Sequence, residues 1–148
     1  MITAQALANT ILMKAFTFDV KVTPMKLQKL MYFIYRDYLK ATRQPLFEED
    51  FLTWKYGPVL SSIYYEFNSF KAQPITRFAK DAQGKVFCAS DDDAQLLQSI
   101  EIVWKKYKDY SGVELSQITH EPGSAWYKAY MSNNNTLKDE DILKDETS

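Results

Sequence analysis

The sequence contains few of the residues from which metal and phosphate sites are built. It has one histidine, one cysteine and four glycines in 148 residues. One His and one Cys cannot supply the four nitrogen and sulfur ligands of a structural zinc site, and a lone cysteine excludes an internal disulfide. The glycines lie too far apart for either glycine-rich phosphate-binding motif, and no calcium-loop motif is present. We therefore expect no metal and no cofactor.

Strong net charge and long apolar runs are also missing. The formal net charge is −1, and only three arginines occur, so no general field attracts nucleic acid or anionic lipid. No apolar run approaches the roughly 18 residues of a membrane span, and no signal peptide precedes the first predicted helix. The single cysteine suits a reducing compartment. We expect a cytoplasmic protein without membrane contact or strong nucleic-acid binding.

The remaining composition is that of a folded domain, with 46% hydrophobic and 15% aromatic residues. The pattern predicts a mainly α single domain of about six helices with a small β-hairpin, over residues 1–131. Residues 132–148 are expected to form a polar, acidic tail that is partly ordered or docked. Periodicity and capping signals predict helices over 3–16, 23–42, 58–70, 91–107, 111–120 and 124–131, with the hairpin over 75–79 and 85–88.

Residues 51–59 (FLTWKYGPV) are the most informative segment. Proline is favoured at the first helical position and glycine accepts unusual backbone angles, so the third helix is predicted to begin at Pro58 after a sharp turn at Gly57. Trp54, Gly57 and Pro58 then have a structural interpretation. Lys55 and Tyr56 have a binding interpretation, because the free N–H groups of the helix start, with two nearby serines, could hold an acidic group.

Two other functions are open from the residues alone. Ser116 and His120 are four residues apart on a predicted helix, as a nucleophile and base of a small enzyme would be. No nucleophile elbow or oxyanion hole is identifiable beside them. Residues 111–131 also resemble a helix-turn-helix of a DNA-binding regulator, but the second helix offers a single lysine, whereas a DNA reader needs several polar and basic side chains.

Three segments together resemble one known family. Residues 23–33 (TPMKLQKLMYF), the corner at 51–59 with Tyr64 and Phe67 beyond it, and residues 114–120 (ELSQITH) followed by Trp126 are similar to the motifs of the Panacea domain family. This family comprises SocA-like antitoxins and phage-associated GepA-type proteins. Two departures are visible: Ala125 replaces the usual proline before the tryptophan, and Arg36-Asp37 replaces a Gly-Trp-like pair.

The resemblance implies a non-enzymatic antitoxin of a toxin–antitoxin system. It would neutralise a protein toxin, encoded beside it, by direct binding or by delivering it to a protease. Family members pair with many unrelated toxins, so the toxin's identity and the oligomeric state are not predicted. The residues expected to bind the partner are Trp54, Lys55, Tyr56, Gly57, Pro58, Tyr64, His120 and Trp126.

Overall fold

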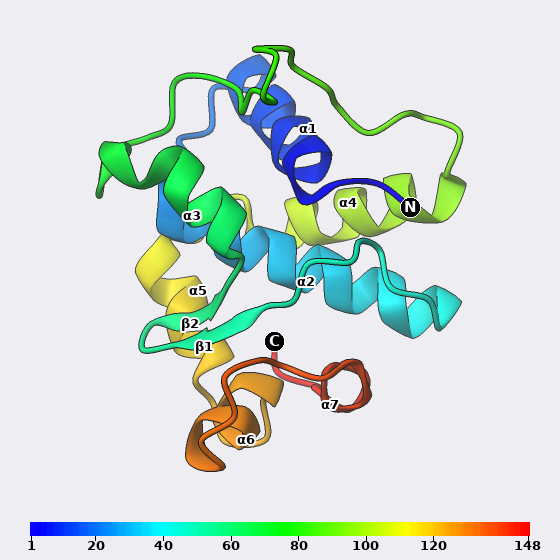
Figure 1. The fold of residues 1–148 in the computed structure, drawn as a ribbon, viewed down its shortest axis with the longest axis vertical. Helices are drawn as coiled ribbons and strands as arrows, with labels where there is room; N and C mark the ends of the chain where they lie inside the picture. The colour runs from blue at the N-terminus through cyan, green and yellow to red at the C-terminus, as the bar shows by residue number, and fades with distance from the viewer.

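Seven α-helices, one short 3₁₀ helix and two β-strands form the computed structural model, which describes all 148 residues (Figure 1). The predicted fold class is confirmed, since the chain is mainly helical with one small antiparallel sheet. The elements in chain order are α1 (Ala4–Thr17), α2 (Pro24–Thr42), β1 (Leu52–Trp54), β2 (Gly57–Val59), α3 (Ser61–Phe67), η1 (Asn68–Phe70), α4 (Ala94–Tyr107), α5 (Gly112–Thr119), α6 (Ala125–Met131) and α7 (Asp139–Leu143).

Local capping signals set most helix starts. The side chains of Thr3, Thr23, Ser111 and Ser124 each accept a hydrogen bond from a backbone N–H of the first turn, which confirms four predicted starts. Glu114 completes a capping box with Ser111. Each such cap contributes about 1 kcal/mol to stability, and the short helices α5 and α6 depend on this contribution.

Helix α2 is the central element of the fold and crosses the middle of the molecule in Figure 1. It contacts α1, α3, α4, α5, α7 and β2. Its apolar residues extend nearly all the way round, as expected for a helix surrounded by others. Three polar side chains, Lys26, Gln28 and Lys29, are nevertheless buried on it. Buried polar groups need hydrogen-bond partners. Lys26 donates to the carbonyl of Lys108, whereas the partners of Gln28 and Lys29 lie in the candidate site.

The hairpin lies at a different place from the one predicted. β1 and β2 form it at residues 52–59, with Trp54 paired to Gly57 across a two-residue turn. Residues 75–88 contain no strand. Their backbone is held instead by Asn9 of α1, whose side chain bonds both the N–H and the carbonyl of Ala79 and the carbonyl of Phe87. These contacts satisfy the backbone without a strand partner.

The predicted start of the third helix is also wrong. Pro58 belongs to β2, and α3 begins three residues later at Ser61. Proline has no N–H to donate, but its carbonyl accepts a hydrogen bond from Lys29 Nζ at 3.1 Å. This contact from α2 favours the extended conformation at Pro58 over the helical one.

The C-terminal residues pack against the rest of the chain. Leu137 and Ile142 are buried in the core, and the backbone N–H of Leu137 donates to Phe51 O at 2.9 Å. A second backbone bond joins Thr53 N–H to Asn135 O at 2.9 Å. The segment therefore covers the outer edge of β1, which would otherwise be unpaired.

One buried carboxylate anchors the end of this segment. Asp145 is 1% exposed and accepts hydrogen bonds from Tyr32 Oη (2.6 Å), Arg36 Nη1 (3.0 Å) and the backbone N–H of Ala125 (3.1 Å). Burial alone would raise the pKa of Asp145, but the hydrogen bonds from Tyr32, Thr147 and Ala125 outweigh it and hold the pKa below its ordinary value. Arg36, one of the two departures from the family pattern, thus has a defined ionic partner.

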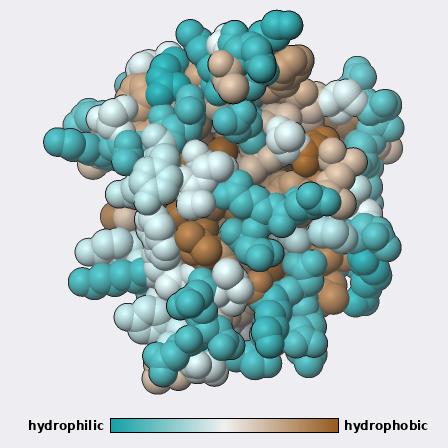
Figure 2. All heavy atoms as spheres, viewed as in Figure 1, coloured by the Kyte–Doolittle hydropathy of each residue, from teal (hydrophilic) through white to brown (hydrophobic).

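The surface is mostly hydrophilic in the view of Figure 2, with hydrophobic side chains visible chiefly in central recesses. None of the helices combines the length and the apolar character that a membrane span requires. Exposed aromatic side chains are concentrated on a few elements, among them the hairpin and α3, where Tyr56, Tyr64 and Tyr65 are 59%, 39% and 69% exposed.

Candidate functional site

Three successive backbone carbonyls at the hairpin turn, those of Trp54, Lys55 and Tyr56, accept hydrogen bonds from side chains of other elements. The donors lie on α5, at its C-cap and on α6. These side chains belong to the third family-like segment, some sixty to seventy residues further along the chain. The bonds are Trp126 Nε1 to Trp54 O, His120 Nε2 to Lys55 O and Ser116 Oγ to Tyr56 O, each 2.7 Å long. The corner and the C-terminal motif therefore form one structural unit.

Helix α2 holds the other side of the hairpin. Gln28 makes two hydrogen bonds to one residue, from its Nε2 to Leu60 O (3.0 Å) and from the Leu60 N–H to its Oε1 (2.9 Å). Lys29 bonds Pro58 O. The residues resembling the family's K-L-Q-K-L segment thus bind backbone, as do those of the C-terminal motif. All three family-like segments meet at residues 54–60.

Gly57 has both the backbone and the surroundings that require a glycine. Its φ is +113°, whereas neither Lys55 nor Tyr56 has a positive φ, so Gly57 alone supplies the unusual backbone of this tight hairpin. A Cβ at this position would lie 2.7 Å from Thr119 Oγ1 and 2.9 Å from Lys29 Cε. The hairpin can approach α2 and α5 this closely only because residue 57 has no side chain.

Lys29 is a buried lysine without an anionic partner. It is 1% exposed, and its ammonium has one hydrogen-bond acceptor, Pro58 O, for three donor hydrogens. Burial lowers the pKa of Lys29 to about 7, because a charged ammonium is poorly solvated there. Lys29 is not among the residues predicted from the sequence to form the site, although a lysine within a helix that is apolar on nearly all sides indicates a buried amine.

We expect the stability of the protein to rise with pH because of Lys29. Between the folded-state pKa of about 7 and the ordinary value of 10.5, the unfolded chain binds a proton that the folded chain does not. Urea unfolding should therefore show wild type gaining about 3 kcal/mol relative to Lys29→Met between pH 7 and 9.5. Parallel stability curves for the two proteins would contradict a neutral, buried Lys29.

The proposed nucleophile–base pair does not form. Ser116 Oγ donates to Tyr56 O, and His120 Nδ1 lies 2.6 Å from the backbone carbonyl of Ser116, not from its hydroxyl. Both ring nitrogens of His120 therefore face carbonyl oxygens. The His120 ring therefore links the end of α5 to the hairpin turn and makes no hydrogen bond with the Ser116 hydroxyl.

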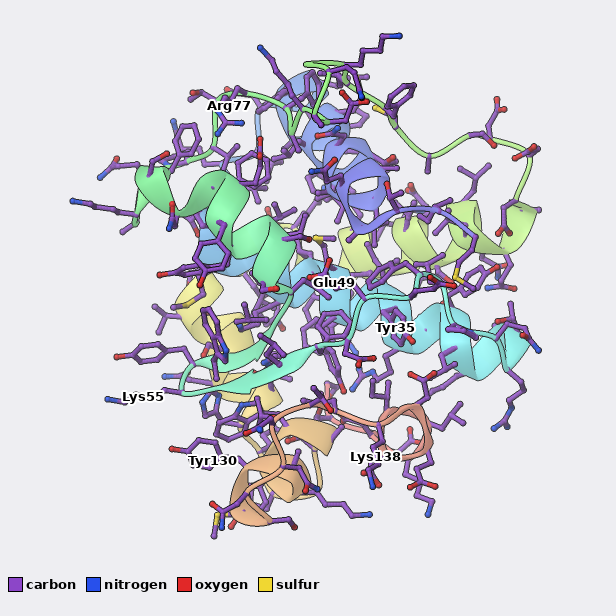
Figure 3. All side chains as sticks on the ribbon, in the orientation of Figure 1. Tyr35, Glu49, Lys55, Arg77, Tyr130 and Lys138 are labelled. Atoms are coloured by element: carbon purple, nitrogen blue, oxygen red, sulfur yellow. The ribbon has the colours of Figure 1, made fainter.

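The hydrogen-bond donors at the start of α3 already bind a carboxylate of the same chain. Glu49 accepts hydrogen bonds from the Ser62 N–H (3.0 Å) and from the Ser62 hydroxyl, and it also contacts the Ser61 hydroxyl. An acidic group does bind there, as the residue types indicated, but it comes from the preceding loop. Lys55 takes no part, since its side chain projects from the tip of the hairpin into solvent (Figure 3).

The exposed part of the site is aromatic. Trp54 packs edge-on against Tyr64 at 4.8 Å between ring centroids, and Tyr64 against Tyr65 at 5.3 Å. Tyr56 is exposed beside them, with Lys55 Nζ 5.5 Å from its ring centroid. We call Trp54, Tyr56, Tyr64 and Tyr65 the aromatic face. Of the predicted site residues, Trp126 is buried beneath the hairpin and His120 is partly covered.

Two pockets flank Tyr56. One, of about 440 Å³, lies between Tyr56, Met25 and the start of α5 and includes Val113 and His120. The other, of about 290 Å³, lies between the hairpin, α2 and α3 and extends to Lys71. Nowhere do three His, Cys, Asp or Glu side chains come together as a metal site requires. Lys128, the only cation of α6, is paired with Asp141 at 2.6 Å.

The fold and the site define a small helical protein with an exposed aromatic surface and a hairpin whose turn is fixed by hydrogen bonds from two other helices. Comparison with known proteins identifies the family to which it belongs. The family model described as "Antitoxin SocA-like, Panacea domain" matches residues 27–127, and the chain belongs to this family. Family membership supports an antitoxin role.

The chain is also similar to a curated antitoxin. The chain is 30% identical to Antitoxin SocA of Caulobacter vibrioides over 127 residues, which cover 83% of this chain and 68% of the relative. No solved structure matches the chain. The family resemblance inferred from the three segments is confirmed.

Proposed function

We propose that this protein neutralises a protein toxin by binding it directly through the aromatic face and Lys55. The main support for the proposal is that, at the hairpin tip, the backbone is held by hydrogen bonds whereas the side chains are exposed to solvent. The carbonyls of Trp54, Lys55 and Tyr56 are all fixed from within. The Lys55 and Tyr56 side chains are exposed and contact each other.

A rigid tip with exposed side chains suits binding for two reasons. Little conformational entropy is lost when a partner docks on a surface that is already ordered. Tyrosine and tryptophan also supply large contact areas and are enriched among residues that dominate binding energy. In this proposal Gly57, Pro58, His120 and Trp126 act by fixing the tip, and the aromatic face contacts the toxin.

The toxin is expected to be encoded beside this protein. Each adjacent reading frame is expressed alone and together with this chain, and growth and co-purification are measured. The proposal requires one neighbour that arrests growth alone, is rescued by coexpression and co-purifies as a stable complex. Rescue with loss of the toxin from the cell, prevented by removing a protease, would support delivery to that protease instead of simple blocking.

Tyr56→Ser should weaken toxin binding by at least tenfold, equivalent to about 1.4 kcal/mol or more, because it removes a well-exposed aromatic side chain from the aromatic face. Affinity is measured by calorimetry on the purified proteins. Tyr127→Ser is the matched control, since Tyr127 is also exposed but lies on α6, outside the aromatic face. Equal effects of the two substitutions, or none, would place the binding surface elsewhere.

A further inference from the structure

The 290 Å³ pocket beside the hairpin has an unusual charge distribution. Its lining includes Trp54, Tyr56 and Tyr64 of the aromatic face and two lysines, Lys29 and Lys71, but no aspartate or glutamate. We call it the lysine pocket. A largely apolar pocket whose lining contains lysines and no carboxylate is electrostatically complementary to an acidic ligand.

Neither lysine is neutralised within the protein. The salt bridges of the structure involve other side chains throughout, so no carboxylate pairs with Lys29 or Lys71. Lys71 is exposed near the end of α3, just after η1. Lys29 is buried, and its ammonium has one protein acceptor. A buried cation without a counter-charge is costly, which is why Lys29 loses its proton near pH 7. A carboxylate that approached it would favour the charged form again.

We propose that the lysine pocket receives an acidic side chain of the bound toxin, whose carboxylate pairs with Lys71 and approaches Lys29. The apolar part of that side chain packs on Trp54, Tyr56 and Tyr64. This inference rests on the proposed function and adds the chemistry of the contact. The pocket adjoins the exposed Tyr56, so a segment lying across the aromatic face reaches it without any change in the hairpin.

Charge reversal at Lys71 tests the contact. Lys71→Glu should weaken toxin binding at least tenfold at 50 mM salt and by less at 500 mM, because salt screens the repulsion. Lys85→Glu is the matched control, since Lys85 is also exposed and undergoes the same charge change but lines neither of the two pockets beside Tyr56. We expect that control to change the affinity by less than twofold. An acidic residue of the toxin changed to lysine should restore binding to Lys71→Glu.

Lys29 provides an independent measurement. The other titratable side chains that line its pocket are Tyr56 on the hairpin, Tyr64 on α3 and Lys71. His120, the C-cap residue of α5, lines the adjoining pocket. At pH 8 the free protein holds Lys29 largely neutral, so pairing with a carboxylate takes up a proton. Calorimetry in phosphate and in Tris should show this uptake for wild type and not for Lys29→Met.

The outcomes separate the two proposals. If no neighbouring toxin binds the wild-type protein, the proposed function and this inference both fail. If the toxin binds wild type and Lys71→Glu with equal affinity, the lysine pocket is not its acidic contact, while the proposed function stands. If Lys29→Met does not fold, Lys71→Glu, its salt dependence and its charge-swap rescue still decide the inference.

Discussion

Gly57→Ala should lower the free energy of unfolding by about 3 kcal/mol, one of the largest losses from a single methyl group in this chain. Part of the loss is backbone strain, since φ is +113°, and such strain costs about 1–3 kcal/mol. The remainder is steric, because the new Cβ would lie 2.7 Å from Thr119 Oγ1 and 2.9 Å from Lys29 Cε. Thermal unfolding should show Tm lower by roughly 10 °C.

Substitutions at two other glycines distinguish the cost of backbone strain from the cost of steric crowding. Gly84 and Gly123 have φ values of +79° and +96°, yet a Cβ on either would meet nothing within 4 Å. Alanine at these positions should cost about 1 kcal/mol, from strain alone. A loss at Gly57 no larger than at Gly84 or Gly123 would show that the hairpin does not press against α2 and α5.

Asp145→Ala should destabilise the protein by about 3–5 kcal/mol, because removing one member of a buried ion pair leaves the other without a partner. The Arg36 side chain is only 12% exposed, and Tyr32 loses its acceptor as well. The C-terminal segment should then detach from α2 and α6. Urea unfolding at pH 7 measures the loss, and limited proteolysis should cut the variant near its C-terminus first.

Neighbouring Glu146 is the control for this prediction. It pairs with Lys40, but its side chain is 83% exposed, so Glu146→Ala should change stability by no more than about 0.5 kcal/mol.

The loss of stability caused by Asp145→Ala should also depend on pH. Its folded-state pKa lies below the ordinary 3.8, so its stabilisation is complete above that pH and is lost as pH falls through the folded value. The difference between wild type and Asp145→Ala should therefore shrink below about pH 4.

Local signals predicted the helices well and the hairpin badly. Thr3, Thr23, Ser111 and Ser124 cap helices through bonds within three residues, so a single sequence contains the whole interaction. Residues 75–88 look strand-like in isolation, but their backbone partner is Asn9, some seventy residues away. Such a long-range contact leaves no local periodic pattern.

The sequence indicated which segments form the candidate site but not how they are arranged. The three family-like segments do meet, yet Pro58 was placed in a helix because its contact with Lys29 is tertiary. Glu49 occupies the helix start that was expected to bind an external acid. The burial of Asp145 could not be predicted, because nothing in a charged C-terminal stretch distinguishes a buried carboxylate from exposed ones until the fold is known.

The hairpin tip is held almost entirely through its backbone oxygens, so its conformation is largely independent of which amino acids stand at 55 and 56. A turn held in this way can change its exposed residues without losing its shape. Libraries randomised at Lys55 and Tyr56 should therefore remain folded in most members while their binding preferences diverge. The same domain could then acquire a new target by substitutions at positions 55 and 56 alone, while the supporting residues of α2, α5 and α6 stay unchanged.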